Sequence, residues 1–349
     1  SNYLTNINFL IDIDKEFGSD VAFLVDGVTK IDHIAFRSLE HKQAENFTKL
    51  FLSLAKDLRV IIIKFADRLN NMETIEYLST KKRKEIALET KEIFVPLAHR
   101  LGMAGLKWKF EDLILKCLDV KSYNDIKKKI EGSSKLNQKI LDSTILPVKN
   151  QLESYKIKSQ ISARYKSISS ISRKIELRNK KFEDIYDLYA IRIIVDKIEE
   201  CYLSLGVIHS IYPPVQERFK DFIATPKTNG YQSIHTTVMT KDNRLTEVQI
   251  RTKEMDYTAE VGVAAHWLYK GNSEMQNFDE QIPWLRDLVV MMTSDNTDPE
   301  ELVEFLKIDM FEDEIFIFTP KGDLIKLPVD STPLDFAFAI HSQLGFSCI

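Results

Sequence analysis

Apolar side chains recur at three- and four-residue spacing from residue 20 to about residue 130, a pattern typical of amphipathic helices that bury one face. The pattern is strongest in four segments, residues 44–58, 60–77, 82–99 and 106–117. It predicts an all-α domain over residues 1–120. Residues 121–160 keep the helical period but are polar and rich in lysine, which predicts long connecting helices with most lysines facing solvent.

The pattern changes near Asp184. Short runs rich in β-branched residues at 190–195, 233–239 and 245–251 indicate strands, and helical stretches at 201–211 and 255–269 lie between and after them. We therefore expect an α/β domain with a mixed sheet over residues 161–272.

The last part of the chain begins with a linker over residues 273–311, which includes a predicted helix near 299–307. Two strands, 314–319 and 323–327, are then joined by the turn sequence PKGD and followed by a helix at 334–341. This order predicts the beginning of a small β-grasp module over residues 312–349. Because the chain lacks an initiator Met and stops within the apolar run LGFSCI, we expect it to be a fragment.

Composition agrees with several folded domains, since 349 residues exceed one ordinary core and 44% of them are hydrophobic. We expect no membrane span, because no apolar run approaches eighteen residues, and the first residues do not have the pattern of a signal peptide. The 3 cysteines are widely spaced and form no zinc motif, so we expect reduced thiols and a cytoplasmic location.

The distribution of charge indicates which kind of ligand the protein binds. A net charge of −4 argues against a protein that coats nucleic acid, so we expect no direct DNA binding. Residues 156–181, however, contain nine Lys or Arg residues and one acid, Glu176. Such a local basic patch suits a phosphorylated small molecule.

The chain has no glycine-rich phosphate loop, so a phosphate site would depend on Lys and Arg side chains. Arg164, Lys166, Arg173 and Lys174 are closely spaced, although a solvated helix face would also explain them. Arg192 is harder to explain in that way, because it lies within the apolar strand AIRIIV, where burial is costly unless an anion meets the charge.

Two carboxylates are candidates for chemistry. Asp187 precedes the strand AIRIIV, and Glu247 opens the strand EVQIRT. Each alone is compatible with an ordinary surface acid, but beside a basic cluster they could hold a divalent metal and accept a proton from an attacking hydroxyl.

The segment RFKDFIATPKTNGYQSIHTTV, residues 218–238, combines cations, an amide and aromatic rings around a turn. Lysines would reach phosphate oxygens, an Asn amide can bind a base edge or ribose, and a Tyr ring can stack on a base. The polar and aromatic residues in question are Arg218, Lys220, Asp221, Lys227, Asn229, Tyr231 and His235.

These motifs closely resemble those of the RelA/SpoT family, and the resemblance covers essentially the whole chain. The synthetase motifs are the segment 218–238 together with IYDLYAIRIIV, EVQIRTKEM and AEVGVAAHWLYK. DGVTK, KFADRLNNMET and PLAHRLGM resemble the family's N-terminal HD-type hydrolase domain, and IFTPKGDLIKLPVDSTPLDFAFAIHSQLG resembles the start of its TGS domain. The resemblance implies an incomplete HD domain, a nucleotidyltransferase-like synthetase domain and an incomplete TGS domain.

It also implies a GTP pyrophosphokinase of the stringent response, which transfers pyrophosphate from ATP to the 3′-hydroxyl of GDP or GTP and releases AMP. The implied ATP ligands are Arg164, Lys166, Lys174 and Arg192. Asp187 and Glu247 would hold Mg²⁺, and Glu247 would also deprotonate the 3′-hydroxyl. Tyr231 would stack on guanine, and the other implied ligands of GDP or GTP are Lys220, Lys227, Asn229 and His235.

The sequence departs from the family in two places. Ser169 and Ser172 stand where aromatic residues are usual. Of the hydrolase metal ligands only Asp67 is present, and Tyr3 and Leu4 occupy the positions of a Glu-Asp pair if Thr5 is aligned with the family's Thr. Truncation and degeneration both fit, so Mn²⁺ is implied only for a complete site in the full-length protein.

Three interpretations follow. The first is a synthetase. The second is an enzyme that is bifunctional in the full-length chain, which the basic RFKD favours. The third is a non-catalytic nucleotide-binding module that senses the ribosome and tRNA through missing C-terminal regions, against which Asp187 and Glu247 both count.

We predict that this chain does not release pyrophosphate from ppGpp, even with Mn²⁺. Activating water requires a tightly held metal, and one carboxylate does not provide that. Asn71 and Thr74 lie four and seven residues after Asp67, so the three share a helix face that lines the hydrolase pocket in the family. The measurement is pyrophosphate release from purified ppGpp, beside an Asp67→Ala control. Release that the control lacks would contradict the prediction.

Overall fold

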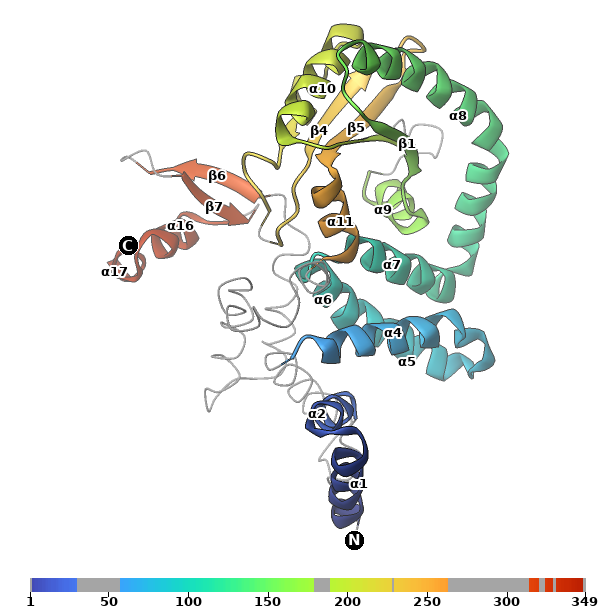
Figure 1. Ribbon diagram of the computed structural model, residues 1–349, viewed down its shortest axis with the longest axis vertical. Coiled ribbons are helices and arrows are strands. Elements are labelled where there is room, and N and C mark those ends of the chain that lie inside the picture. Colours follow the sequence, from blue (N-terminus) through green and yellow to red (C-terminus); the bar gives the residue numbers. More distant parts are fainter. Residues whose placement is uncertain are drawn as a thin grey trace.

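The structure is a computed structural model that describes residues 2–29, 57–178, 189–227, 229–262, 314–319, 324–328 and 331–347 (Figure 1). Its N-terminal part is helical in every described element, as predicted. The elements are α1 (Asn2–Phe17), α2 (Ser19–Val28), α4 (Arg59–Glu73), the 3-10 turn η1 (Ile75–Tyr77), α5 (Thr80–Glu89), the π-helical turn η2 (Thr90–Phe94), α6 (Val95–Arg100) and α7 (Ala104–Leu118). Of the predicted helix at 44–58, residues 44–56 lie outside the described residues.

Aromatic rings form the centre of the helical core. Phe65 of α4, Phe94 of η2 and Phe110 of α7 contact one another with ring centroids 6.1–6.4 Å apart. Arg68, on the same buried face of α4, forms two hydrogen bonds to Glu89 and lies 4.3 Å from the centre of the Phe94 ring. The core therefore fixes the orientation of α7, the helix that reaches the second domain.

Residues 120–154 form one long helix, α8 (Val120–Ser154), which curves from the helical domain to the sheet (Figure 1). The helix ends at Ser154, six residues before residue 160, where the predicted connecting helices end. Lys156, with a φ of 59°, turns the chain away from the helix. The backbone N–H of Ile157 donates to the carbonyl of Leu152, and that of Lys156 donates to the carbonyl of Glu153, so the end is a Schellman motif. Both Leu152 and Ile157 are buried in the core of the sheet domain.

The predicted mixed sheet is confirmed, with strand order β1-β2-β5-β4-β3. Only β2 and β5 are parallel neighbours, and the other pairs are antiparallel. The strands are β1 (Gln160–Tyr165), β2 (Tyr189–Val195), β3 (Lys220–Asp221), β4 (Ile234–Met239) and β5 (Leu245–Thr252). Three helices accompany them: α9 (Ile168–Arg178), α10 (Ile198–Ile211) and α11 (Lys253–Val261).

Two strands were not predicted, β1 and the two-residue β3. QISARY forms β1 at the sheet edge, so the interpretation of Arg164 as part of a solvated helix face is wrong. Lys166 follows the strand, and only Arg173 and Lys174 are helical, on α9. Ile161 and Ala163 alternate with polar residues and pack on the core, which explains why this polar segment can pair with β2.

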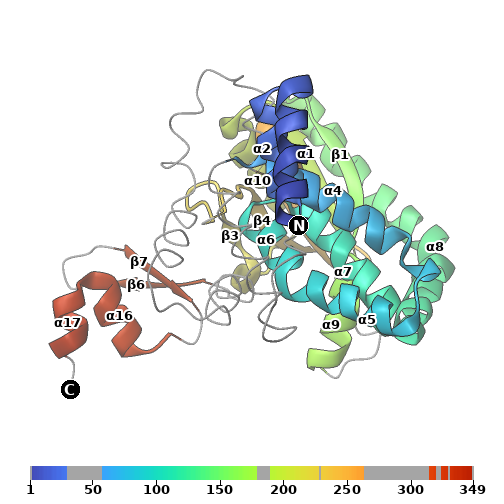
Figure 2. The ribbon, with the colours of Figure 1, turned by 90° about the horizontal axis from the view of Figure 1, so that it is seen from below.

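The C-terminal part confirms the predicted hairpin and helix. β6 (Glu314–Phe318) pairs antiparallel with β7 (Leu324–Pro328), and α16 (Pro333–Ile340) and α17 (Ser342–Ser347) follow (Figure 2). Thr332 and Asp335 form a capping box that starts α16. Among the described helices, none has the length and apolar character needed to cross a bilayer.

Candidate functional site

One face of the five-stranded sheet gathers most of the predicted site residues. Side chains alternate between faces along a strand, and Ile191, Ile193, Val248 and Ile250 point into the core with α10. The residues between them face the other way. The strand pairing aligns one row of this face across all five strands: Ser162, Arg192, Gln249, His235 and Lys220. The neighbouring row contains Arg164, Ala190, Glu247 and Thr237.

Glu247 lies at the centre of this face and is held by two donors. Lys166 Nζ is 2.9 Å from its Oε2 atom, and Gln249 Nε2 donates to its Oε1 atom over 2.8 Å. Burial alone would raise the pKa of Glu247, but the Lys166 charge and the Gln249 hydrogen bond outweigh it and lower that pKa. The carboxylate is therefore ionised and able to accept a proton.

Tyr231 and His235 form an aromatic pair beside Glu247. Tyr231 Oη is 2.8 Å from His235 Nε2, and His235 Nδ1 is 3.6 Å from Glu247 Oε1. The Phe222 ring contacts both rings edge-on, with centroids 6.0 and 5.3 Å away. Burial lowers the pKa of His235 to about 4 despite the Glu247 charge, so the imidazole is neutral at pH 7. These contacts fix the orientation of the Tyr231 ring.

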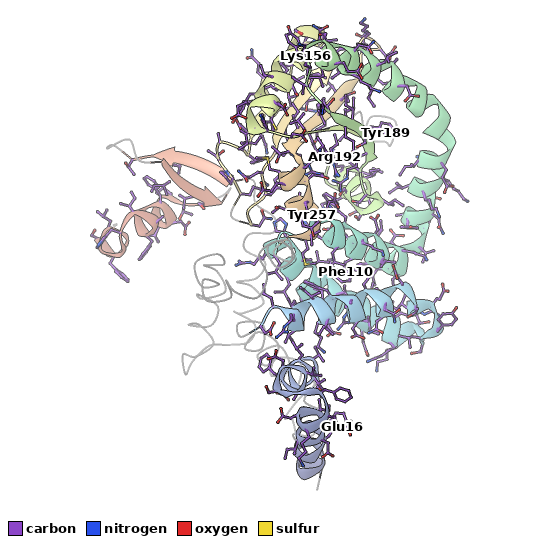
Figure 3. All side chains as sticks on the ribbon, in the orientation of Figure 1. Glu16, Phe110, Lys156, Tyr189, Arg192 and Tyr257 are labelled. Atoms are coloured by element: carbon purple, nitrogen blue, oxygen red, sulfur yellow. The ribbon has the colours of Figure 1, made fainter. Side chains whose placement is uncertain are left out.

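Arg164 and Arg192 provide positive charge on the opposite side of Glu247. Arg192, labelled in Figure 3, extends from β2 toward α11, where its Nη1 atom lies 3.1 Å from both Asp256 Oδ1 and Glu260 Oε1. Burial and the charge of Arg192 lower the pKa of Arg164 to about 10. The two guanidinium groups are therefore close enough to repel each other, an arrangement that an anionic ligand would stabilise.

Strand β3 and the loop between β3 and β4 carry the remaining predicted acceptor residues. Lys220 faces His235 in the sheet register, and Lys227 Nζ lies 4.9 Å from the centre of the Phe222 ring. Asn229 Nδ2 donates to the carbonyl of His99 over 3.1 Å, while its Oδ1 atom accepts from the backbone N–H of Tyr231. The Asn229 amide thus ties this loop to the helical domain, and its role as a nucleotide ligand stays a prediction.

The remaining residues singled out from the sequence have no described contact with Glu247. Lys174 is partly buried on α9, and Asp187 lies outside the described residues. Ser169 and Ser172, the two departures from the family pattern, are buried. The backbone N–H of Ser169 donates to Asp112 Oδ1 of α7 over 2.8 Å.

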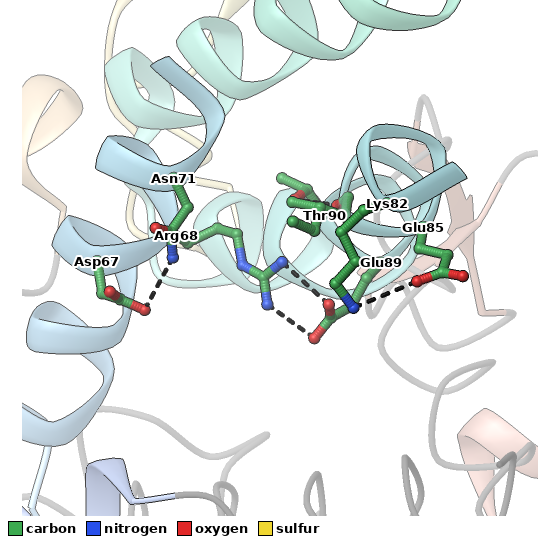
Figure 4. Close-up of polar contacts among 8 residues, drawn as sticks. Asp67, Arg68, Asn71, Lys82, Glu85, Glu89 and Thr90 are labelled. Carbon is green, nitrogen blue, oxygen red and sulfur yellow. Dashed lines mark hydrogen bonds and ion pairs between the residues drawn. The ribbon is translucent and has the colours of Figure 1, made fainter. Parts of the chain in front are cut away.

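Asp67 is exposed on α4, in the helical domain and away from the sheet. Asn71 Nδ2 lies 3.3 Å from Asp67 Oδ2 on one helix face, while Arg68 points the other way toward Glu89 (Figure 4). Thr74 Oγ1 donates to the carbonyl of Asn70. In the part of the chain that the structure describes, no three His, Cys, Asp or Glu side chains come together as a metal site.

Several site residues were missed from the sequence. Gln249 and Arg251 follow Glu247 at alternate positions in EVQIRT, so strand periodicity would have placed them on the same face. Arg251 is 1% exposed and lies 2.5 Å from Asp256 Oδ1 through its Nη2 atom. Trp108 of α7 contacts Arg164. The helical spacing of apolar residues around Trp108 does not distinguish it from a residue of the helical core.

Comparison with known proteins identifies three regions. Residues 163–274 match a family described as the region found in RelA/SpoT proteins, residues 3–104 match the HD domain, and residues 315–349 match the TGS domain. A GTP pyrophosphokinase of Myxococcus xanthus is 43% identical over 97% of this chain and 45% of its own length. The bifunctional (p)ppGpp synthase/hydrolase SpoT of Escherichia coli K12 is 41% identical over 97% of this chain and 48% of its own length.

The chain thus spans about half the length of these curated relatives. Among solved structures, small alarmone synthetase 1 from Bacillus subtilis, bound to its product pppGpp, is 19% identical with a TM-score of 0.33. That likeness covers 48% of this chain and 95% of the synthetase chain.

Proposed function

Because this chain belongs to the RelA/SpoT family, we propose that it is a (p)ppGpp synthetase that transfers pyrophosphate from ATP to the 3′-hydroxyl of GDP or GTP. The observation that carries the proposal is the position of Glu247. An ionised carboxylate lies on one sheet face between Arg164 and Arg192 on one side and Tyr231 and His235 on the other. This order suits a base placed between a polyphosphate donor and an aromatic-bound acceptor.

In the proposed reaction, Glu247 accepts the proton of the 3′-hydroxyl as its oxygen attacks the β-phosphorus of ATP. The bond from the β-phosphorus to the oxygen that bridges to the α-phosphorus breaks, and AMP leaves with that oxygen. Lys166 and Arg164 offset the charge that develops on the transferred group. The Lys166 contact also keeps Glu247 ionised before the acceptor binds.

We propose Mg²⁺ as the metal, held by Glu247 and Asp187. The donor chemistry fits, because Mg²⁺ takes one or two carboxylates and fills its other positions with phosphate oxygens and water. Glu247 presents a partly buried carboxylate on the cationic face, which supports this assignment. When bound, the metal would neutralise charge on the phosphates.

A second activity is proposed for the whole protein only. Residues 3–104 match the HD domain, and the relative from E. coli is named as both synthase and hydrolase. These observations favour a bifunctional full-length enzyme. The ribosome and tRNA remain proposed partners of regions beyond this chain.

The direct test is incubation of the purified chain with labelled ATP, Mg²⁺ and either GDP or GTP. The expected products are ppGpp or pppGpp, formed in equal amount with AMP. ATP without an acceptor nucleotide is the control. Nucleotide binding without either product would favour the non-catalytic module instead.

Tyr231→Ala is expected to weaken GDP binding by roughly 1–3 kcal/mol, the range for base–aromatic stacking. Tyr231→Phe keeps the ring and loses the hydroxyl with its contact to His235, so its effect should be mild. Calorimetric titration with GDP and with an ATP analogue measures both affinities. ATP binding should hardly change, and Tyr77→Ala, at a side chain 84% exposed in the helical domain, is the matched control. Equal losses for both nucleotides would indicate a folding defect.

A further inference from the structure

Helix α7 contacts both domains. Phe110 and Ile114 pack in the helical domain, while the opposite side of the helix contacts the synthetase domain (Figures 1 and 3). Glu111 Oε1 lies 2.8 Å from Arg173 Nη2, and Asp112 accepts a hydrogen bond from Ser169. One turn earlier, the Trp108 indole covers Arg164, with the guanidinium carbon 3.5 Å from the ring centre.

We propose that Trp108 is an ATP-positioning residue of the synthetase site, which holds the Arg164 guanidinium flat against its indole and presents the opposite face to ATP. The inference deepens the proposed function and rests on it. A distance of 3.5 Å is a direct stacking contact, so one face of the guanidinium is covered by the indole. Its other face and its N–H edge remain for a ligand.

The two arginines of the donor side are held in different ways. Arg192 is fixed by the carboxylates of Asp256 and Glu260. In the part of the chain that the structure describes, Arg164 is held by an aromatic face, and no carboxylate lies within ion-pair distance. An aromatic support leaves the N–H groups available for phosphate or base, whereas a carboxylate would occupy them.

The repulsion between the two guanidinium groups makes such a support necessary. Without a partner, Arg164 would rotate away from Arg192 on its flexible side chain. Burial and the Arg192 charge act together on Arg164, and they lower its pKa to about 10. The indole offsets this cost because a cation–π contact becomes stronger when it is shielded from water.

The position of Trp108 depends on the docking of the α6–α7 turn. Asn229 Nδ2 donates to the His99 carbonyl, and a Cβ placed on Gly262 would lie 2.2 Å from the Leu101 carbonyl oxygen. The turn therefore lies directly on the end of α11. Burial lowers the pKa of Lys107, the residue before Trp108, and the positive charges of Arg173 and Lys227 lower it further.

The test compares Trp108→Ala, Trp108→Phe and the control Lys109→Ala, whose exposed side chain points from the same helix toward Glu73. Affinities for a non-hydrolysable ATP analogue and for GDP are measured by calorimetry, and KM and kcat by product formation. We expect Trp108→Ala to weaken ATP binding by about 3- to 30-fold, as loss of a cation–π contact would, and to leave GDP binding within about twofold. Trp108→Phe should restore most of the ATP affinity.

A double-mutant cycle with Arg164→Ala shows whether Trp108 acts through the arginine. We expect the double variant to bind ATP no more weakly than Arg164→Ala alone. Unchanged ATP affinity in Trp108→Ala, equal loss of GDP affinity, or additive effects in the cycle would each overturn the inference. If the unmodified chain forms no ppGpp but Trp108→Ala still weakens ATP binding selectively, the proposed function fails and only the role of Trp108 in ATP binding stands.

Discussion

Replacing Glu247 by Gln is expected to lower the turnover of ppGpp synthesis by at least about a hundredfold, the usual contribution of a general base. The amide has nearly the same shape, and its oxygen can still accept a hydrogen bond from Lys166 or Gln249. It cannot take the proton of the 3′-hydroxyl. Affinities for ATP and GDP should therefore stay nearly intact, because the surrounding cations and aromatic rings remain in place.

The measurement is the initial rate of ppGpp formation at saturating nucleotides, combined with calorimetric titration of each nucleotide. Glu254→Gln is the matched control, because it makes the same chemical change at an exposed position in the first turn of α11. The proposed role of Glu247 would be abandoned if its variant kept most of the turnover. A parallel loss of turnover in both variants would point to a general effect of charge.

Periodicity predicted most of the architecture because each domain buries its elements in a regular way. The apolar faces of α4 and α7 meet in one core, and the β-branched runs form β2, β4 and β5 at the centre of the sheet. The strand β1 was missed because its sequence, QISARY, is polar and follows a lysine-rich helix. It is a strand because it pairs with β2 along its whole length, a contact that local sequence does not report.

The candidate site was predictable to the extent that its residues lie on neighbouring strands. Alternation along EVQIRT and AIRIIV places Glu247, Gln249 and Arg192 on one face, and the register then adds His235. The contribution of the helical domain was not predictable. Trp108 meets Arg164, and the His99 carbonyl meets Asn229, only because the helical core and the core of the sheet domain dock against each other.

The contact between the α6–α7 turn and the end of α11 is expected to contribute strongly to stability. Gly262→Ala is expected to lower the free energy of unfolding by about 2–5 kcal/mol, as strained backbone and overpacking together would. Gly262 ends α11 with φ 64° and ψ −143°, a conformation open almost only to glycine. A Cβ there would also lie 2.2 Å from the Leu101 carbonyl oxygen and 2.8 Å from the carbonyl carbon of Gly102. Backbone atoms cannot move aside as a flexible side chain can.

The measurement is urea unfolding followed by circular dichroism, with ATP affinity determined on the folded variant. Gly206→Ala is the control, since this exposed glycine in α10 has no atom within 4 Å of its added Cβ. Alanine should stabilise that helix by up to about 1 kcal/mol. If Gly262→Ala separates the α6–α7 turn from α11, Trp108 moves away from Arg164, so ATP binding should weaken. A Gly262→Ala variant as stable as the unmodified chain would show that the turn and α11 are not held together at this contact.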